Sequence, residues 1–93
     1  MRDRVTKQKL EKYFSITERA LDKAKKSIIK GKESQAKEII EMVKNYLLDA
    51  RHFQEKGEFV NAFASINYSH GWLDSGVRLD VFDVKDNNLF TIK

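Results

Sequence analysis

Apolar side chains recur every three or four residues along most of the chain, and this spacing constrains the fold more than any other feature of the sequence. The first series steps by 4, 3, 4, 3 and 4 residues: Leu10, Phe14, Thr17, Leu21, Ala24 and Ile28. A period of about 3.6 residues places such positions on one face of an α-helix. The spacing therefore predicts a helix over 3–30 that buries this face.

Two further series of the same kind predict a second and a third helix. The second is Ala36, Ile40, Val43, Leu47 and Ala50, beside a flanking row of Ile39, Tyr46 and Phe53. The third is Phe59, Phe63, Ile66, His70, Leu73 and Val77. Gly31 and Gly57 are expected to end the first two helices, and Ser34 is expected to cap the second. The predicted bounds of these helices are 34–56 and 58–80.

The last residues do not follow the helical period. Phe82-Asp83-Val84 and Leu89-Phe90-Thr91-Ile92 flank Asp86-Asn87-Asn88, whose residue types favour turns. The sequence predicts an extended or hairpin-like tail over 82–93. Because an isolated hairpin is only marginally stable in water, this tail either folds back on the bundle, which we favour, or contacts another chain.

These elements together predict an all-α fold. Short links between long helices imply antiparallel neighbours, so we expect an antiparallel three-helix bundle with a short C-terminal tail. A chain of 93 residues suits one hydrophobic core, so residues 1–93 are predicted to form a single domain.

The composition limits the possible functions. The chain contains no Cys, which excludes disulfides and thiolate ligands, and it has no apolar run of the roughly 18 residues that a membrane span needs. It also lacks the glycine-rich loops that bind phosphates and the G-x-S-x-G turn of hydrolases. We therefore expect a cytoplasmic protein that is not an enzyme, with no cofactor, no metal and no membrane partner.

The segment from Tyr68 to Gly76 is the most unusual of the chain, because two glycines lie inside a predicted helix. Each Gly lowers helix stability by about 0.5–1 kcal/mol relative to Ala. Close approach of a neighbouring helix over Gly71 or Gly76 is the preferred explanation.

The same segment contributes half of a candidate polar site. Its members are Asp49, His52, Asn67, Tyr68, His70 and Asp74. His70 and Asp74 lie one turn apart, but a catalytic zinc ion normally needs three protein ligands, and no such motif is present. We favour a structural explanation, in which His70 lies at the edge of the core with a hydrogen bond to a side chain on another helix, and Asp74 pairs with Arg78.

Basic residues form a second candidate site. Residues 1–56 contain fifteen basic and nine acidic side chains, whereas residues 57–93 contain three and five. Arg19, Lys23, Lys26 and Lys30 step by 4, 3 and 4 residues on the predicted outer face of the first helix, a spacing that could follow nucleic-acid phosphates. Glu18 and Asp22 interrupt this face, which favours an ordinary solvated surface.

Several strings of the second and third helices resemble a known family. They are Tyr46-Leu47-Leu48-Asp49-Ala50, Phe53, Gly57, Ala62-Phe63-Ala64 and the run from Ile66 to Gly76. They resemble an archaeal family named domain of unknown function 357. The resemblance implies a three-helix fold and an archaeal source, and it assigns no activity. Asp80 stands where we would expect this family to have Gly.

These observations leave three functional hypotheses. The preferred one is a non-catalytic module that binds another protein, or its own copy, through the end of the third helix and the apolar tail from Phe82 to Ile92. The alternative is a nucleic-acid-binding accessory domain that uses the basic face of the first helix. An enzyme acting on a small molecule or using a metal, centred on His70 and Asp74, comes third.

Overall fold

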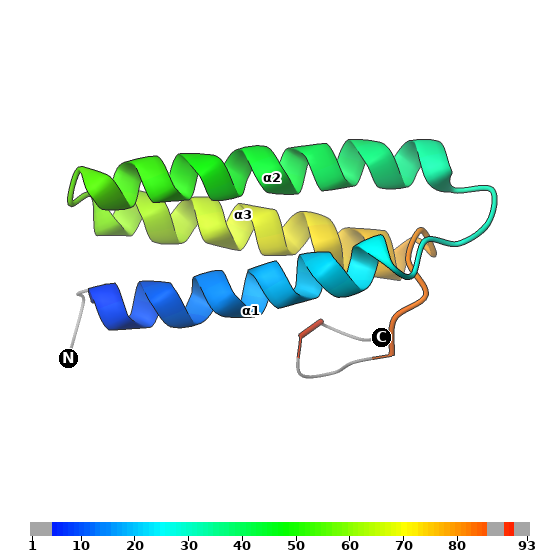
Figure 1. Ribbon diagram of the computed structural model, residues 1–93, viewed down its shortest axis with the longest axis horizontal. Coiled ribbons are helices and arrows are strands. Elements are labelled where there is room, and N and C mark those ends of the chain that lie inside the picture. The colour runs from blue at the N-terminus through cyan, green and yellow to red at the C-terminus, as the bar shows by residue number, and fades with distance from the viewer. Residues whose placement is uncertain (1–4, 86–88, 91–93) are drawn as a thin grey trace.

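Three antiparallel α-helices form the protein, as the sequence predicted (Figure 1). A computed structural model describes residues 5–85 and 89–90. The helices are α1 (Lys7–Lys25), α2 (Glu33–Glu55) and α3 (Phe59–Arg78), and no strand is assigned within the described residues. α2 runs opposite to α1 and α3. The fold is an all-α three-helix bundle.

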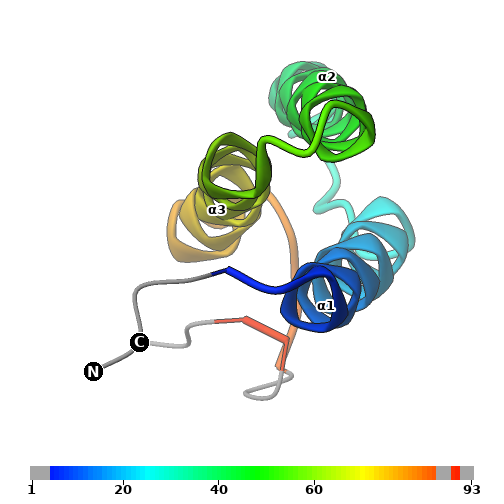
Figure 2. The ribbon, with the colours of Figure 1, turned by 90° about the vertical axis from the view of Figure 1, so that its left-hand side faces the viewer.

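Helix α3 is the central helix of the bundle. It packs most extensively against α2 and less against α1, whereas α1 and α2 contact each other least. Figure 2 shows both neighbours lying to one side of α3. The opposite side of α3 therefore has no helix packed against it.

The buried face of α3 differs from the predicted one. The predicted series emphasised large residues, but Phe59, Phe63 and Val77 are only half-buried. The buried residues of this helix are mostly small: Ala62, Ser65, Ile66, Ser69, Leu73 and Gly76. Small side chains allow α2 to approach closely, and the hydroxyl of Ser69 donates a 2.9 Å hydrogen bond to the carbonyl of Val43 on α2.

Helix α1 is shorter than the predicted range of 3–30. It begins after Thr6, whose side-chain oxygen accepts a hydrogen bond from the Lys9 backbone, and it ends at Lys25. The following residues pair with the C-terminal tail instead: the Ile29 N–H donates to the Val81 carbonyl at 2.9 Å, and the Asp83 N–H donates to the Ser27 carbonyl at 2.8 Å. Backbone groups used in this pairing cannot also continue a helix.

The same pairing corrects two further predictions. Ile28 was expected on the buried helical face, but it lies in the link, forms an isolated antiparallel bridge with Phe82 and is 37% exposed. Gly31 was expected to end the first helix, which already ends at Lys25. Gly31 nevertheless adopts the left-handed conformation, with φ of 94°, inside the link between α1 and α2.

At the ends of α2, one prediction is wrong and one is confirmed. Ser34 is not the cap, because α2 begins after Lys32, and the Glu33 carboxylate accepts a hydrogen bond from the Gly31 N–H at 3.0 Å. Gly57 ends the helix as predicted, with φ of 77°. The Glu58 N–H reaches back to the Phe53 carbonyl at 2.9 Å, which satisfies an otherwise free carbonyl of the last turn.

Helix α3 ends at Arg78, two residues before the predicted bound of 80. It ends in the same type of turn as α2, but without Gly. Asp80 adopts the left-handed conformation with φ of 60°. The Val81 N–H donates to the Gly76 carbonyl at 2.8 Å, and the Asp80 N–H donates to the Val77 carbonyl at 3.2 Å. This pattern is the Schellman motif, in which Gly is the usual left-handed residue and Asp is tolerated. The turn directs the chain back toward α1.

The C-terminal tail folds back and becomes part of the core, as favoured from the sequence. Its described apolar residues are all buried: Val81, Phe82, Val84, Leu89 and Phe90. They pack against Ala20, Ala24, Ala36, Ile39, Val43 and Leu73. The turn predicted at 86–88 and the end of the tail at 91–93 lie outside the described residues, so the hairpin stays a prediction.

A polar cluster connects α1 to α2 at the other end of the bundle. Arg51 lies over the ring of Phe14, with its guanidinium carbon 3.6 Å from the ring centre, and donates a 3.1 Å hydrogen bond to Glu11. Gln54 donates a 2.8 Å hydrogen bond to the same carboxylate. The hydrogen bond from Gln54, followed by that from Arg51, lowers the pKa of Glu11 below its ordinary value.

Candidate functional site in the α1–α3 groove and on the outer face of α3

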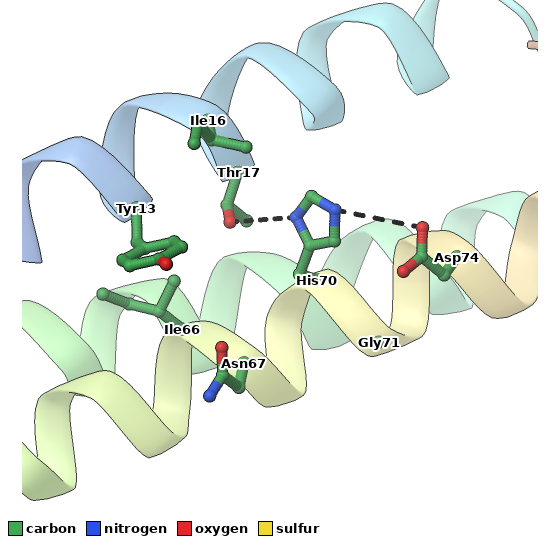
Figure 3. A pocket seen from close by; sticks show the side chains of 8 residues that line it. All are labelled: Tyr13, Ile16, Thr17, Ile66, Asn67, His70, Gly71 and Asp74. Carbon is green, nitrogen blue, oxygen red and sulfur yellow. Dashed lines mark hydrogen bonds and ion pairs between the residues drawn. The ribbon is translucent and has the colours of Figure 1, made fainter. Parts of the chain in front are cut away.

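A pocket of about 350 Å³ opens between α1 and α3 (Figure 3). Its lining residues are Tyr13, Ile16 and Thr17 from α1 and Ile66, Asn67, His70, Gly71 and Asp74 from α3. Tyr13, Ile16 and Ile66 contribute apolar side chains to it, and Thr17, Asn67, His70 and Asp74 contribute polar ones. We call this pocket the α1–α3 groove.

His70 is held between two polar neighbours in this groove. Its Nδ1 atom lies 3.1 Å from the hydroxyl oxygen of Thr17, and its Nε2 atom lies 3.9 Å from a carboxylate oxygen of Asp74 (Figure 3). Thr17 is only 1% exposed. A neutral His70 can accept the Thr17 hydrogen bond at Nδ1 while its Nε2–H is directed at Asp74. The expected hydrogen bond to a side chain on another helix is confirmed.

The groove brings together only part of the predicted polar site. Asn67, His70 and Asp74 line it, whereas Asp49 and His52 are exposed on α2 and do not. Tyr68 is exposed outside the groove, with its ring 5.6 Å from that of Tyr46 on α2. Tyr13 and Thr17 were not predicted to belong to this site, because their place beside His70 depends on how α1 packs on α3.

The chemistry of the groove is that of a satisfied hydrogen-bonding network. Among residues 5–85 and 89–90, no three His, Asp or Glu side chains gather closely enough to hold a metal ion. In the same residues, no buried side-chain nitrogen or oxygen lacks a hydrogen-bond partner. The Thr17 hydroxyl lies within hydrogen-bonding distance of His70, but Thr17 is almost fully buried, which suits a structural hydrogen bond better than an accessible nucleophile. The arrangement supports the structural explanation of His70.

The side of α3 that has no helix packed against it forms a second candidate site. Its exposed apolar and small residues are Val60, Ala64, Tyr68, Gly71, Trp72, Ser75 and, directly after the helix, Leu79, which we call the outer face of α3; Asn61, Asn67 and Arg78 are exposed beside them. Val60, Tyr68 and Leu79 are 66%, 63% and 69% exposed, and Trp72 is 39% exposed. Asp74 and Arg78 are the single acidic and the single basic residue of α3. This face is therefore apolar and almost free of charge.

The two glycines of α3 have different surroundings. A Cβ atom at Gly76 would overlap the ring of Phe82 in the tail and lie 3.2 Å from Ile39 on α2, so close packing explains this Gly, although the tail approaches it more closely than the neighbouring helix does. A Cβ atom at Gly71 would meet nothing within 4 Å, so the packing explanation is wrong for Gly71. Gly71 instead borders both the α1–α3 groove and a shallow hollow beside Tyr68 and Trp72. The surface over Gly71 is open.

Residues 12–82, which include most of α1, all of α2 and α3 and the start of the tail, match a family described as a protein of unknown function, DUF357. The chain belongs to this family. No curated protein and no solved structure matches the chain. Membership of DUF357 confirms the family that the strings around His70 suggested and transfers no activity to any residue. The archaeal source implied by that resemblance stays a prediction.

In this DUF357 protein the four predicted phosphate-facing residues do not follow one helical face. Arg19 and Lys23 lie on α1, but Lys26 and Lys30 lie beyond its end, in the link to α2. Lys26 forms an exposed ion pair of 3.1 Å with Asp22, and Glu18 and Asp22 line the same hollow as Arg19 and Lys23. Acidic side chains therefore lie among the basic ones on this surface.

Among the described residues, no helix combines the length and the apolar composition needed to cross a membrane. The cytoplasmic location inferred from the sequence stays a prediction.

The contact between His70 and Thr17 predicts a measurable loss of stability. Replacing His70 by Leu removes the hydrogen-bond partner of a buried hydroxyl and should lower the free energy of unfolding by about 1–3 kcal/mol. The double variant His70→Leu with Thr17→Val removes both polar groups and should lose less than the sum of the two single variants. Urea unfolding of the four proteins measures this coupling. A His70→Leu variant as stable as the wild type would contradict the structural role.

Proposed function

We propose that this protein is a non-catalytic protein-interaction module that binds through the outer face of α3. The observation that carries the proposal is the exposure of Val60, Tyr68 and Leu79 on a helix with one acidic and one basic residue. Contiguous apolar surface is uncommon on monomeric proteins and is typical of interaction sites. Its burial against a partner would remove apolar area from water, which favours association.

The residue types of this face support the same proposal. Tyr and Trp are enriched among the residues that contribute most to protein–protein binding, and charged residues are depleted at the centre of such interfaces. Tyr68 and Trp72 lie one turn apart near the middle of the face, and the polar side chains of Asn61, Asn67 and Arg78 border it. The face thus has an apolar centre and a polar rim.

The proposed surface excludes the C-terminal tail. The sequence hypothesis placed binding on the tail from Phe82 to Ile92 because its apolar residues were expected to be available. Val81, Phe82, Val84, Leu89 and Phe90 are buried in the core and are not available to a partner. Of the region named in that hypothesis, the end of α3 keeps an exposed apolar side chain, that of Leu79.

The test compares tagged variants in an affinity purification from an extract of the cells that make the protein. A variant with Tyr68→Ser and Leu79→Ser changes the outer face, and Leu48→Ser is the matched control because Leu48 is 70% exposed on α2. We expect a protein partner that survives nuclease treatment and binds the control normally. The double variant should bind it at least about 30-fold more weakly, as for the loss of a residue that dominates an interface.

Two outcomes would overturn the proposal. If the outer-face variant retains the partner as well as the Leu48→Ser control does, binding uses another surface. If the bound material disappears with nuclease or moderate salt and is lost in an Arg19→Glu, Lys23→Glu variant, the protein binds nucleic acid instead.

A further inference from the structure

We infer that the α1–α3 groove binds a small organic cation, with its ammonium group at Asp74 and its apolar body beside Tyr13. The inference goes beyond the proposed function, because it assigns a small-molecule site to the groove. Four features of the groove support it: its size, its half-buried apolar side chains, the charges at its two ends and the missing side chain at Gly71.

The size of the groove suits a small ligand. Its volume of about 350 Å³ lies at the lower end of the range for ligand pockets, roughly 300–1,000 Å³. Along α3 its lining extends from Ile66 to Asp74, a distance of about 12 Å at a rise of about 1.5 Å per residue. A molecule of about ten non-hydrogen atoms therefore fits the groove along its length.

Apolar side chains of α1 remain partly accessible in the groove. Tyr13 and Ile16 are only half-buried, and they lie across the groove from the α3 residues Ile66 and Asn67 (Figure 3). An apolar ligand body beside them would remove their remaining surface from water, which favours binding. Ligand pockets commonly combine such apolar contact area with a few polar groups that fix the orientation.

The charged group of the groove is a carboxylate. Of the described residues that line it, Asp74 is the acidic one, and none is Lys or Arg. Asp74 contacts His70 through one oxygen, but the two oxygens of a carboxylate offer about four acceptor positions. The formal net charge of +4 is screened beyond about 8 Å at physiological salt, so the nearby carboxylate dominates. The groove therefore favours a cationic hydrogen-bond donor over an anion.

A basic residue beyond the opposite end of the groove determines the direction of the ligand. The Nζ atom of Lys9 lies 5.7 Å from the ring centre of Phe63. This ring packs edge-to-face against Tyr13, with 5.2 Å between the ring centres. An ammonium group is thus repelled at the Tyr13 end and attracted at the Asp74 end. The apolar body of the ligand extends toward Tyr13.

His70 holds the Asp74 carboxylate in place. Nδ1 of His70 lies 3.1 Å from the Thr17 hydroxyl oxygen, and Nε2 is directed at Asp74. The His70 ring also lies beside that of Phe90, with 6.4 Å between the ring centres. A binding group that is fixed before the ligand arrives loses less conformational freedom on binding. The network that stabilises the fold therefore also prepares the groove for a cation.

Gly71 leaves a gap in the wall of the groove between Asn67 and Asp74. These three residues follow at intervals of four and three positions, so they lie along one stripe of α3. A Cβ atom at Gly71 would meet nothing within 4 Å, although Gly weakens the interior of a helix relative to Ala. A ligand beside Gly71 can contact the backbone of α3. This contact gives a reason for a Gly that the packing of the chain does not explain.

The test titrates the purified, isotope-labelled full chain with phenethylamine at pH 7 and follows the backbone amide signals by NMR. The probe combines an apolar ring with an amine that, like that of Lys, is charged at this pH. The amides of Asn67, Gly71 and Asp74 should shift to saturation, with a dissociation constant of about 1 mM. Phenethyl alcohol has nearly the same shape without the charge and should bind about tenfold more weakly.

Two variants separate the contribution of charge from that of space. Asp74→Asn should weaken the binding of phenethylamine about tenfold and so remove the difference between the amine and the alcohol. Gly71→Ala should weaken the binding of both about threefold or more, because its methyl group takes up space beside the ligand, while the protein itself becomes more stable. Asp49→Asn is the matched control, because Asp49 is exposed on α2 and does not line the groove.

A titration to about 20 mM phenethylamine without saturable shifts, or with the largest shifts outside the groove, would overturn the inference. Equal affinities of the wild type for the amine and the alcohol would do the same. An Asp74→Asn or Gly71→Ala variant that binds the amine as tightly as the wild type would also contradict it. The proposed function is tested separately, by the loss of a protein partner from the Tyr68→Ser, Leu79→Ser variant.

Discussion

Replacing Phe82 by Ala lowers the free energy of unfolding by about 3–5 kcal/mol, the range for removing a large buried aromatic side chain. The ring of Phe82 is 1% exposed and belongs to the core cluster that joins the tail to α1, α2 and α3. Chemical denaturation followed by circular dichroism measures the loss. Leu79→Ala is the matched control, because Leu79 is 69% exposed three residues away and should change stability by no more than about 0.5 kcal/mol.

The size of this effect also predicts the result of shortening the chain. Single domains are stable by only about 5–15 kcal/mol, so the loss of Phe82 together with the buried Val84, Leu89 and Phe90 should leave the three helices unfolded. A tail that served only for binding, as in the hypothesis from the sequence, could be deleted without unfolding the bundle. A helical, cooperatively unfolding protein without residues 82–93 would show that the tail is not part of the core.

Substituting the two glycines of α3 by Ala should change stability in opposite directions. At Gly76 the new Cβ atom would lie 2.6 Å from Cδ2 of the Phe82 ring, so the ring must move and stability should fall by about 1–3 kcal/mol. At Gly71 the new Cβ atom meets nothing within 4 Å, and the higher helix propensity of Ala should raise stability by about 0.5–1 kcal/mol.

Thermal and urea unfolding of the two variants provide the comparison, and each variant is the control for the other. Both substitutions add the same methyl group to the same helix, five residues apart. Equal effects would mean that helix propensity alone decides the outcome and that Phe82 does not pack on Gly76. A destabilised Gly71→Ala variant would mean that the surface over Gly71 is already occupied.

The sequence by itself determined the number and approximate place of the helices. The period of apolar residues is local information, and each series contains enough repeats to define a helix without knowledge of its neighbours. The left-handed positions at Gly31 and Gly57 were also predictable, because Gly adopts positive φ at little steric cost. The strings around His70 were sufficient to suggest the DUF357 family, to which the chain belongs.

The tertiary structure alone decided which groups meet across the helices. α1 ends at Lys25 because the backbone of Ser27 and Ile29 pairs with the tail more than fifty residues later, and no local pattern carries that information. The pairing of Thr17 with His70, the burial of the small residues of α3 and the open surface over Gly71 likewise depend on how the helices pack. The local period of apolar residues shows which side chains favour burial. Which of these side chains are in fact buried depends on how α1, α2 and the tail share the surface of α3.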